Sequence, residues 1–128
     1  MNKKVFYTFV DAINQHAIDG IYSLLTDDHK FIDAQGNEIT GKDKMKIAWQ
    51  GYFELFPDYK IEVIDVFESV NVIGAFGSAS GSFKNDKKNQ FLKLPAAWKA
   101  IIENDKVKLW QVYADTKIPY DIISGQSQ

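Results

Sequence analysis

The chain has 128 residues, of which 45% are hydrophobic and 25% charged, and these values are typical of one globular domain. It has no cysteine, which excludes disulfide bonds, thiol nucleophiles and thiolate metal sites. All 15 basic residues are lysine, so enzymes that need an active-site arginine are excluded, and the net charge of −2 gives no reason to expect a nucleic-acid partner.

The first 57 residues have helical spacing. Apolar residues recur every three or four positions from Phe6 to Ala17, which predicts an amphipathic helix. A shorter helix is expected around residues 21–25, followed by a break at residues 26–28 and a short extended piece at residues 30–33. Thr40 is the expected cap of a third helix that Pro57 ends. Six apolar residues share one stripe of that helix: Met45, Ala48, Trp49, Tyr52, Phe53 and Phe56.

After Pro57 the pattern changes to that of strands, which are predicted over residues 59–67, 70–83, 90–103 and 107–115. The short breaks between them predict an antiparallel meander, in which Pro95 marks a bulge or an edge.

The segment from Gly74 to Ser82 consists of Gly, Ala and Ser apart from Phe76, which favours a sharp bend of the sheet over room for a ligand or a second backbone. The expected domain covers residues 1–118, and a polar, frayed tail covers residues 119–128.

Helices followed by a long antiparallel sheet predict an α+β fold, with three N-terminal helices packed on a curved sheet. Apolar residues occupy both faces of the last strand, where Leu109 and Tyr113 alternate with Trp110 and Val112. A second apolar face predicts a homodimer through the outer face of the sheet. The alternative is that Trp110 packs under the C-terminal tail.

Four segments together resemble the SnoaL-like branch of the nuclear-transport-factor-2-like superfamily over nearly the whole chain. They are LLTDDHKFID (residues 24–33), GNEITGKDKM (36–45), YFELFPDY (52–59) and KLWQVYAD (108–115). The resemblance implies a cone, in which a strongly curved sheet surrounds a pocket that helices close, and it implies frequent sheet-to-sheet dimers. The superfamily contains many enzymes and many binding modules, so the fold alone does not give the function.

Two carboxylates are candidate catalytic groups, because Asp33 and Asp115 each end a predicted strand and are expected to project into the cone. A carboxyl group in an apolar cavity acquires a raised pKa and acts as a base near neutral pH. Alternatively, Asp33 forms an Asx-type turn before Gln35, and Asp115 is a solvated strand end or accepts hydrogen bonds from the turn after it. Aromatic residues are expected to line the pocket and bind substrate: Phe9, Trp49, Tyr52, Phe53, Trp98 and Tyr113.

The resemblance separates the chemistries of the superfamily. In its ketosteroid isomerases the general base matches Asp33, but the oxyanion-hole tyrosine falls on Phe9 and the oxyanion-hole aspartic acid falls near Ala97 or Trp98. Without these donors, steroid isomerisation by that mechanism is excluded. In SnoaL-like polyketide cyclases an aspartate just after a tryptophan on the last strand is the acid/base, and Asp115 fits this position. The resemblance to these cyclases implies an intramolecular aldol closure without metal or cofactor.

Other branches match poorly. The epoxide hydrolases of the superfamily use an arginine that this chain lacks, and the dehydratases use pocket histidines, whereas His16 and His29 are placed differently. No metal site is expected.

Two functions stay open: a cofactor-independent cyclase, isomerase or lyase acting on a hydrophobic carbonyl substrate, or a non-catalytic ligand-binding or dimeric association module. The apolar run at residues 5–10 is too short for a signal peptide, so the cytoplasm is the expected compartment and no membrane partner is expected.

Overall fold

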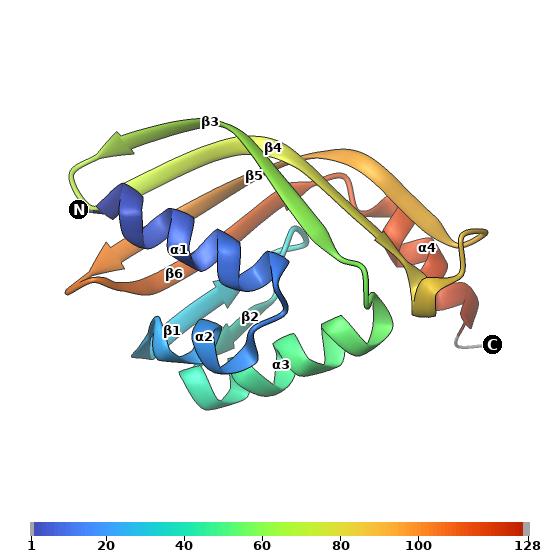
Figure 1. Ribbon diagram of the computed structural model, residues 1–128, viewed down its shortest axis with the longest axis horizontal. Coiled ribbons are helices and arrows are strands. Elements are labelled where there is room, and N and C mark those ends of the chain that lie inside the picture. The colour runs from blue at the N-terminus through green and yellow to red at the C-terminus, as the bar shows by residue number, and fades with distance from the viewer. Residues whose placement is uncertain (1, 127–128) are drawn as a thin grey trace.

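The computed structural model describes residues 2–126 of the chain, which form four α-helices and one six-stranded sheet (Figure 1). Three helices lie in the N-terminal half, as predicted, and one follows the last strand. They are α1 (Asn2–Asn14), α2 (Ile18–Ser23), α3 (Lys42–Leu55) and α4 (Lys117–Gln126). None of the helices in this described range is long and apolar enough to cross a membrane.

The sheet has the strand order β2-β1-β6-β5-β4-β3, and every neighbouring pair is antiparallel except β1 and β6. The strands are β1 (Leu25–Ile32), β2 (Glu38–Thr40), β3 (Lys60–Ser69), β4 (Val72–Ser82), β5 (Gln90–Glu103) and β6 (Lys106–Ala114). A single 3-10 turn, η1 (Phe83–Asn85), follows β4. The predicted α+β fold and the antiparallel meander from β3 to β6 are therefore confirmed.

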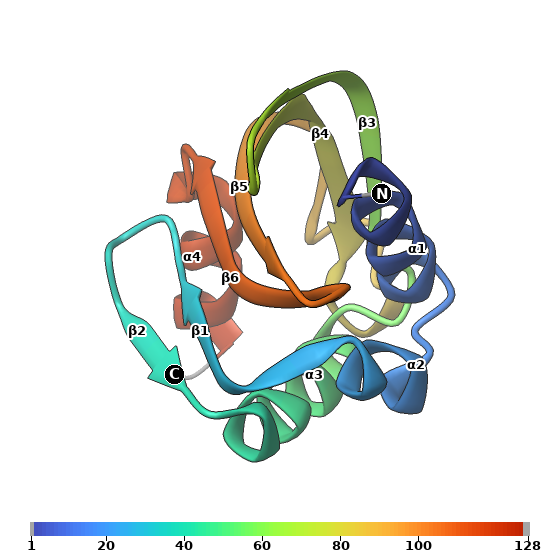
Figure 2. The ribbon, with the colours of Figure 1, turned by 90° about the vertical axis from the view of Figure 1, so that its left-hand side faces the viewer.

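The sheet is strongly curved, and the helices lie on its concave side (Figures 1 and 2). Helix α1 lies under the arch of β3 to β6, and α2 and α3 continue below it. Helix α4 lies at the end of the molecule opposite to the N-terminus. This arrangement leaves space between α3, α4 and the sheet, where the candidate site lies.

Aromatic side chains join α1 to the sheet. The predicted apolar face of α1 is confirmed, since Phe6, Phe9 and Ile13 are buried. The ring centroid of Phe9 lies 5.0 Å from that of Trp110, and Trp110 stacks on Trp98 with the ring centroids 6.3 Å apart. Each buried aromatic side chain of this kind stabilises the fold by roughly 1.5–3 kcal/mol. The inner face of β6 is thus covered by α1 of the same chain.

The bend of the sheet depends on Gly77. A Cβ atom at this position would lie only 1.8 Å from the carbonyl oxygen of Glu62 on the neighbouring strand. The register of β3 against β4 shifts next to this contact, between Val63 and Asp65. Only glycine allows the two backbones to approach so closely, so at Gly77 the small residue gives room to a second backbone, next to a register shift that is typical of a bulge and its local bend.

Pro95 lies at a local edge of the sheet, as predicted. The last pair between β5 and β6 is Ala96 with Ala114, so β5 continues past its neighbour at Pro95. A bulge precedes it, where the register of β4 against β5 shifts and Lys93 adopts a positive φ of 48°. The missing N–H of proline is tolerated where one side of the strand is unpaired.

Three local predictions differ from the structure. Residues 26–28 do not break the chain but belong to β1, where Asp27 and Asp28 form ion pairs with lysines on its exposed side. Thr40 does not cap α3, because Gly41 occupies the N-cap position without a side-chain cap. Residues 120–126, expected to be frayed, belong to α4, and residues 127–128 of the expected tail lie outside the described residues.

Candidate functional site

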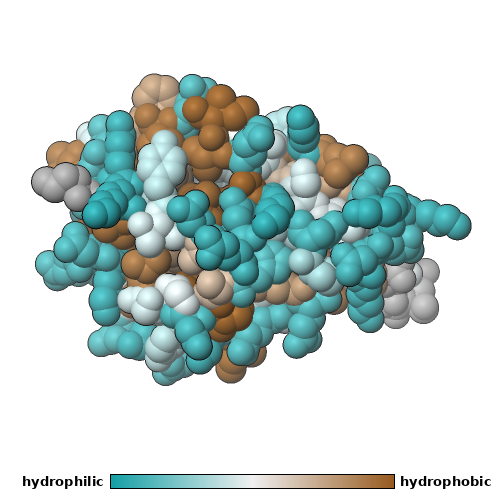
Figure 3. Space-filling view, viewed as in Figure 1, coloured by the Kyte–Doolittle hydropathy of each residue, from teal (hydrophilic) through white to brown (hydrophobic). Residues whose placement is uncertain are grey.

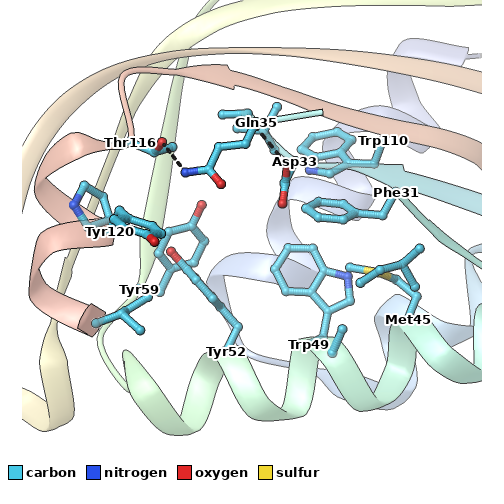
Figure 4. Close-up of a pocket in the computed structure, with 16 residues that line it drawn as sticks. Phe31, Asp33, Gln35, Met45, Trp49, Tyr52, Tyr59, Trp110, Thr116 and Tyr120 are labelled. Atoms are coloured by element: carbon cyan, nitrogen blue, oxygen red, sulfur yellow. Dashed lines mark hydrogen bonds between the residues drawn. The ribbon is translucent and has the colours of Figure 1, made fainter. Parts of the chain in front are cut away.

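A cavity of about 380 Å³ lies between α3, α4 and the sheet (Figure 4). Most of its wall is apolar or aromatic, and a few polar groups interrupt the wall. The lining residues are Phe31, Asp33, Ala34, Gln35, Ile39, Met45, Ala48, Trp49, Tyr52, Tyr59, Trp110, Val112, Thr116, Pro119, Tyr120 and Ile123.

Helical spacing explains one wall of the cavity. Met45, Trp49 and Tyr52 are separated by one turn each on α3, so their side chains project from the same face of the helix (Figure 4). The opposite wall comes from the alternation of β6, which directs Trp110 and Val112 inward. Helix α4 and the turn after β1 complete the enclosure.

Asp33 is the acidic group of the cavity. Its Oδ1 accepts hydrogen bonds from the backbone N–H of Gln35 and of Asn37, each at 2.9 Å, which confirms the Asx-type turn. Its Oδ2 accepts a hydrogen bond from Asn37 Nδ2 at 3.1 Å. The side chain is half-buried, and Figure 4 shows the carboxylate directed toward the side of the cavity that Trp49 occupies. Asp33 thus has a structural role in the turn while its carboxylate stays available to a ligand.

Tyrosine hydroxyls form a second polar group. The side chains of Tyr52 and Tyr59 contact each other edge to face, with ring centroids 5.0 Å apart, and Figure 4 shows their hydroxyls on the same side of the cavity as that of Tyr120. Burial raises the pKa of Tyr52 and of Tyr59 well above the ordinary value, so both phenols stay protonated near neutral pH. Protonated phenols are neutral donors that can bind a ligand oxygen.

Two further polar groups lie near the mouth and the floor. Gln35 Nε2 donates a hydrogen bond to Thr116 Oγ1 at 3.4 Å, which links the turn after β1 to the start of α4. The indole N–H of Trp49 is buried and has no hydrogen-bond partner among the described residues. An orphaned buried donor is uncommon in proteins.

The structure brings only some of the sequence-predicted residues together. Asp33, Trp49 and Tyr52 line the cavity. Phe9, Phe53 and Trp98 are buried in the core instead and are absent from the lining set. Tyr113 is 51% exposed and lies on the outer face of the sheet. Phe53 stacks on His16 with a centroid distance of 4.0 Å, which holds the end of α3 against the turn after α1.

Asp115 is exposed and does not line the cavity. Its Oδ1 accepts a hydrogen bond from the backbone N–H of Lys117 at 3.0 Å, at the first turn of α4. This geometry is that of an Asx-type turn, in which the side-chain oxygen accepts the N–H two residues later. The observation favours the alternative that Asp115 has a structural role. Unlike Asp33, Asp115 does not line the cavity.

Sequence reasoning missed the residues of α4 that line the cavity, which are Pro119, Tyr120 and Ile123. A signal was present, because an aspartate two residues before the helix and a proline in its first turn are typical of a helix N-terminus. It also missed Tyr59, which directly precedes β3. Within residues 2–126 no group of three or more His, Cys, Asp or Glu side chains could hold a metal ion.

The SnoaL-like domain family matches residues 6–116 of the chain. The chain belongs to this family. A search of curated proteins finds no match. Family membership gives the scaffold, and the function still depends on the cavity described above.

Solved structures of SnoaL-like and related proteins share the fold at low sequence identity. A Shewanella putrefaciens protein assigned as a SnoaL-like polyketide cyclase is 12% identical with a TM-score of 0.81, covering 98% of this chain and 86% of its own. A Catenulispora acidiphila protein with a ketosteroid-isomerase-like fold, in complex with trimethylamine, is 13% identical with a TM-score of 0.77, covering 87% and 85%.

An epoxide hydrolase of M. tuberculosis is 12% identical with a TM-score of 0.77, covering 95% of this chain and 86% of its own. These likenesses, together with that to an NTF2-like protein of Cytophaga hutchinsonii, show that this SnoaL-like chain has the NTF2-like fold. Because the identities are low and the activities differ, they carry no conclusion about chemistry.

Proposed function

We propose that this SnoaL-like protein binds a small, largely apolar organic molecule in the cavity between α3, α4 and the sheet. The observation that carries the proposal is the composition of the wall, in which aromatic and aliphatic side chains surround a few polar groups within about 380 Å³. Volumes of roughly 300–1,000 Å³ and walls of this composition are typical of small-molecule sites. A structural neighbour with a ketosteroid-isomerase-like fold was solved with a small molecule, trimethylamine, which supports a binding role for the fold.

Indole and 1-tetralone test this binding function directly. Either compound should raise the melting temperature at millimolar concentration and change the tryptophan fluorescence, because Trp49 and Trp110 line the cavity. The variant Ala48→Leu, which fills the cavity from α3, should weaken this binding. Gln50→Leu places the same leucine side chain on the exposed side of the same helix, outside the cavity, and should bind as the parent does. The absence of any response to both compounds would refute the proposal.

A second candidate function is proton transfer at a carbon next to a carbonyl, and Asp33 is the group that favours it. Its Oδ2 accepts one hydrogen bond from the described residues, from Asn37, and the protonated hydroxyls of Tyr52 and Tyr59 line the same cavity. A carboxylate base on one side of a cavity and neutral phenol donors on the other suit enolisation of a bound ketone. The base takes the α proton, and the phenols stabilise the enolate oxygen.

Deuterium exchange at the α carbon of 1-tetralone tests this chemistry without a known substrate. We expect the parent protein to accelerate exchange in D₂O, Asp33→Asn to lose the acceleration, and Asp115→Asn to keep it. The reverse result would support the sequence-based prediction that Asp115 is the acid/base. Binding of 1-tetralone without accelerated exchange would leave the protein as a binding module and refute the catalytic candidate.

We also propose a homodimer through the outer face of the sheet. Phe67 and Phe76 are 63% and 53% exposed and contact each other edge to face, with ring centroids 6.1 Å apart. Phe76 pairs with Ala97 and Ala97 with Tyr113, so apolar side chains form a row across three strands. Figure 3 shows apolar surface gathered over β3 and β4. Exposed apolar patches of this kind commonly mark interfaces.

Analytical ultracentrifugation tests the dimer. Phe76→Lys should convert a micromolar solution from dimer to monomer, because it places a charge in the apolar row. Val70→Lys, in the turn between β3 and β4, is the control, since Val70 is 88% exposed and lies outside the row. A parent protein that sediments as a monomer at this concentration would contradict the proposal.

A further inference from the structure

The cavity wall combines aromatic rings with a single charge. Asp33 is the one charged side chain among the described residues that line it. Six of the lining residues are aromatic: Phe31, Trp49, Tyr52, Tyr59, Trp110 and Tyr120. Figure 4 shows the Asp33 carboxylate above the indole of Trp49, with the tyrosine rings on the other side of the cavity.

The structure does not neutralise the Asp33 carboxylate. All three of its hydrogen bonds come from uncharged N–H groups of Gln35 and Asn37. None of the ion pairs in residues 2–126 includes Asp33, and the nearby lysine Lys30 pairs with Glu38 at 3.3 Å. The carboxylate therefore presents its negative charge to the cavity.

The aromatic rings add to this negative potential. The face of an aromatic ring is its negative side, so ring faces attract cations and repel anions. Tyr52 and Tyr59 stay protonated and contribute no charge of their own. Low-dielectric walls strengthen the field inside a cavity compared with water. A carboxylate beside several aromatic rings is a combination that suits an organic ammonium group.

We propose that the ligand is an organic cation, an alkylated amine whose ammonium head lies against Asp33 and the aromatic rings. This inference rests on the proposed binding function and specifies the chemical class of the ligand. The apolar remainder of the molecule occupies the aliphatic part of the wall, to which Met45 and Val112 belong. Asp33 acts as the counter-ion, and its turn hydrogen bonds hold the carboxylate in place.

Three probes of nearly identical shape separate charge from shape. Choline is the cation, 3,3-dimethylbutan-1-ol replaces its nitrogen with carbon, and 3,3-dimethylbutanoate is the matching anion. Their dissociation constants are measured by NMR titration, with tryptophan fluorescence as a second readout. We expect choline to bind roughly five- to tenfold more tightly than the alcohol, in line with cation–π and carboxylate contacts at a half-buried site. The anion should bind most weakly.

Matched charge variants assign the preference to Asp33. Asp33→Asn keeps an oxygen acceptor for the turn and removes the charge, so the affinity for choline should fall roughly fivefold, while that for the alcohol should change less than about twofold. Asp115→Asn removes the same charge outside the cavity and should leave both affinities unchanged. Tyr120→Leu, at a residue that is 56% exposed, should reduce the preference for choline without affecting the core.

The outcomes distinguish this inference from the binding function on which it rests. Binding of the alcohol as tightly as choline, or choline affinity unaffected by Asp33→Asn, would overturn the inference and leave the cavity as a site for neutral molecules. Binding of 1-tetralone without binding of choline would overturn it in the same way. The absence of any response to indole and to 1-tetralone would overturn the binding function itself, and this inference with it.

Discussion

Replacing Gly77 with alanine tests the contact that allows the sheet to bend. The new Cβ atom would lie 1.8 Å from the carbonyl oxygen of Glu62, 2.9 Å from its carbonyl carbon and 3.1 Å from the Cα atom of Val63. All three neighbours are backbone atoms, so no side-chain rotation can relieve the overlap. Strand β3 must move away from β4 by about 1 Å or more, since real Cβ contacts lie beyond 3.0 Å.

The expected cost follows from what this movement disrupts. Overpacking costs roughly 1–3 kcal/mol, and each backbone hydrogen bond lost between the strands costs about 0.5–1.5 kcal/mol. Alanine also restricts the unfolded chain, which offsets about 0.4–1 kcal/mol. We therefore expect Gly77→Ala to lower the free energy of unfolding by roughly 2–4 kcal/mol.

Urea unfolding followed by tryptophan fluorescence measures this loss, and Gly74→Ala is the matched control. Gly74 lies on the same strand, and a Cβ atom there would meet nothing within 4 Å. The control should be neutral or slightly stabilising, because it restricts the unfolded chain without a clash. A Gly77→Ala protein as stable as Gly74→Ala would refute the argument that close backbone approach requires glycine at the bend.

Two further predictions concern polar groups that are buried or half-buried. His29 is buried, and its Nδ1 donates a hydrogen bond to the carbonyl oxygen of Val107 at 2.7 Å. Burial lowers the pKa of His29, so the folded state favours the neutral ring. Because the pKa is lower in the folded state than in the unfolded one, this stability is present above about pH 6.5 and is lost as the pH falls below it. Urea unfolding between about pH 8 and 5 should show the decline in the free energy of unfolding. The variant His29→Asn keeps a donor for Val107 and should show a smaller decline. An equal dependence of stability on pH in both proteins would contradict the assignment to His29. Asp58 accepts hydrogen bonds from Ser82 Oγ at 2.5 Å and Ser82 N at 2.7 Å, so Asp58→Ala should cost roughly 1–3 kcal/mol by thermal unfolding. The double variant Asp58→Ala/Ser82→Ala should cost less than the sum of the single changes, and strict additivity would argue against direct coupling.

The fold could be predicted from the sequence because its periodicities are strong. The apolar stripe of α1 and the alternation of the long strands each match the buried face in the structure. Helix α4 was missed because the segment after Pro119 was interpreted as a polar tail, although Pro119, Ile122 and Ile123 recur at helical spacing. Asp115 was interpreted through its position after the last strand, where an aspartate that accepts a hydrogen bond in a turn cannot be distinguished by sequence from one that faces a cavity.

The alternation of side chains along β6 divides its residues between two faces, and the sequence analysis did not use this division to decide which residues reach the site. It places Tyr113 and Asp115 on the face opposite to Trp110 and Val112. Which face points inward depends on α1, whose Phe6 and Phe9 cover Trp110. That packing is a tertiary contact between residues more than a hundred positions apart, and no local pattern reports it. The same ambiguity did not affect Asp33, which lies in a turn at the mouth of the cavity.

Helix α4 has a consequence for how ligand preference could diverge among relatives. The family match ends at residue 116, and α4 begins at Lys117. One wall of the cavity, including Tyr120 and Ile123, therefore comes from residues beyond those that match the family. Sequence changes in α4 would alter this wall directly, while the residues of α3 and β6 that form the opposite walls stay the same. Grafting residues 117–126 onto a related SnoaL-like protein would accordingly transfer part of the ligand preference.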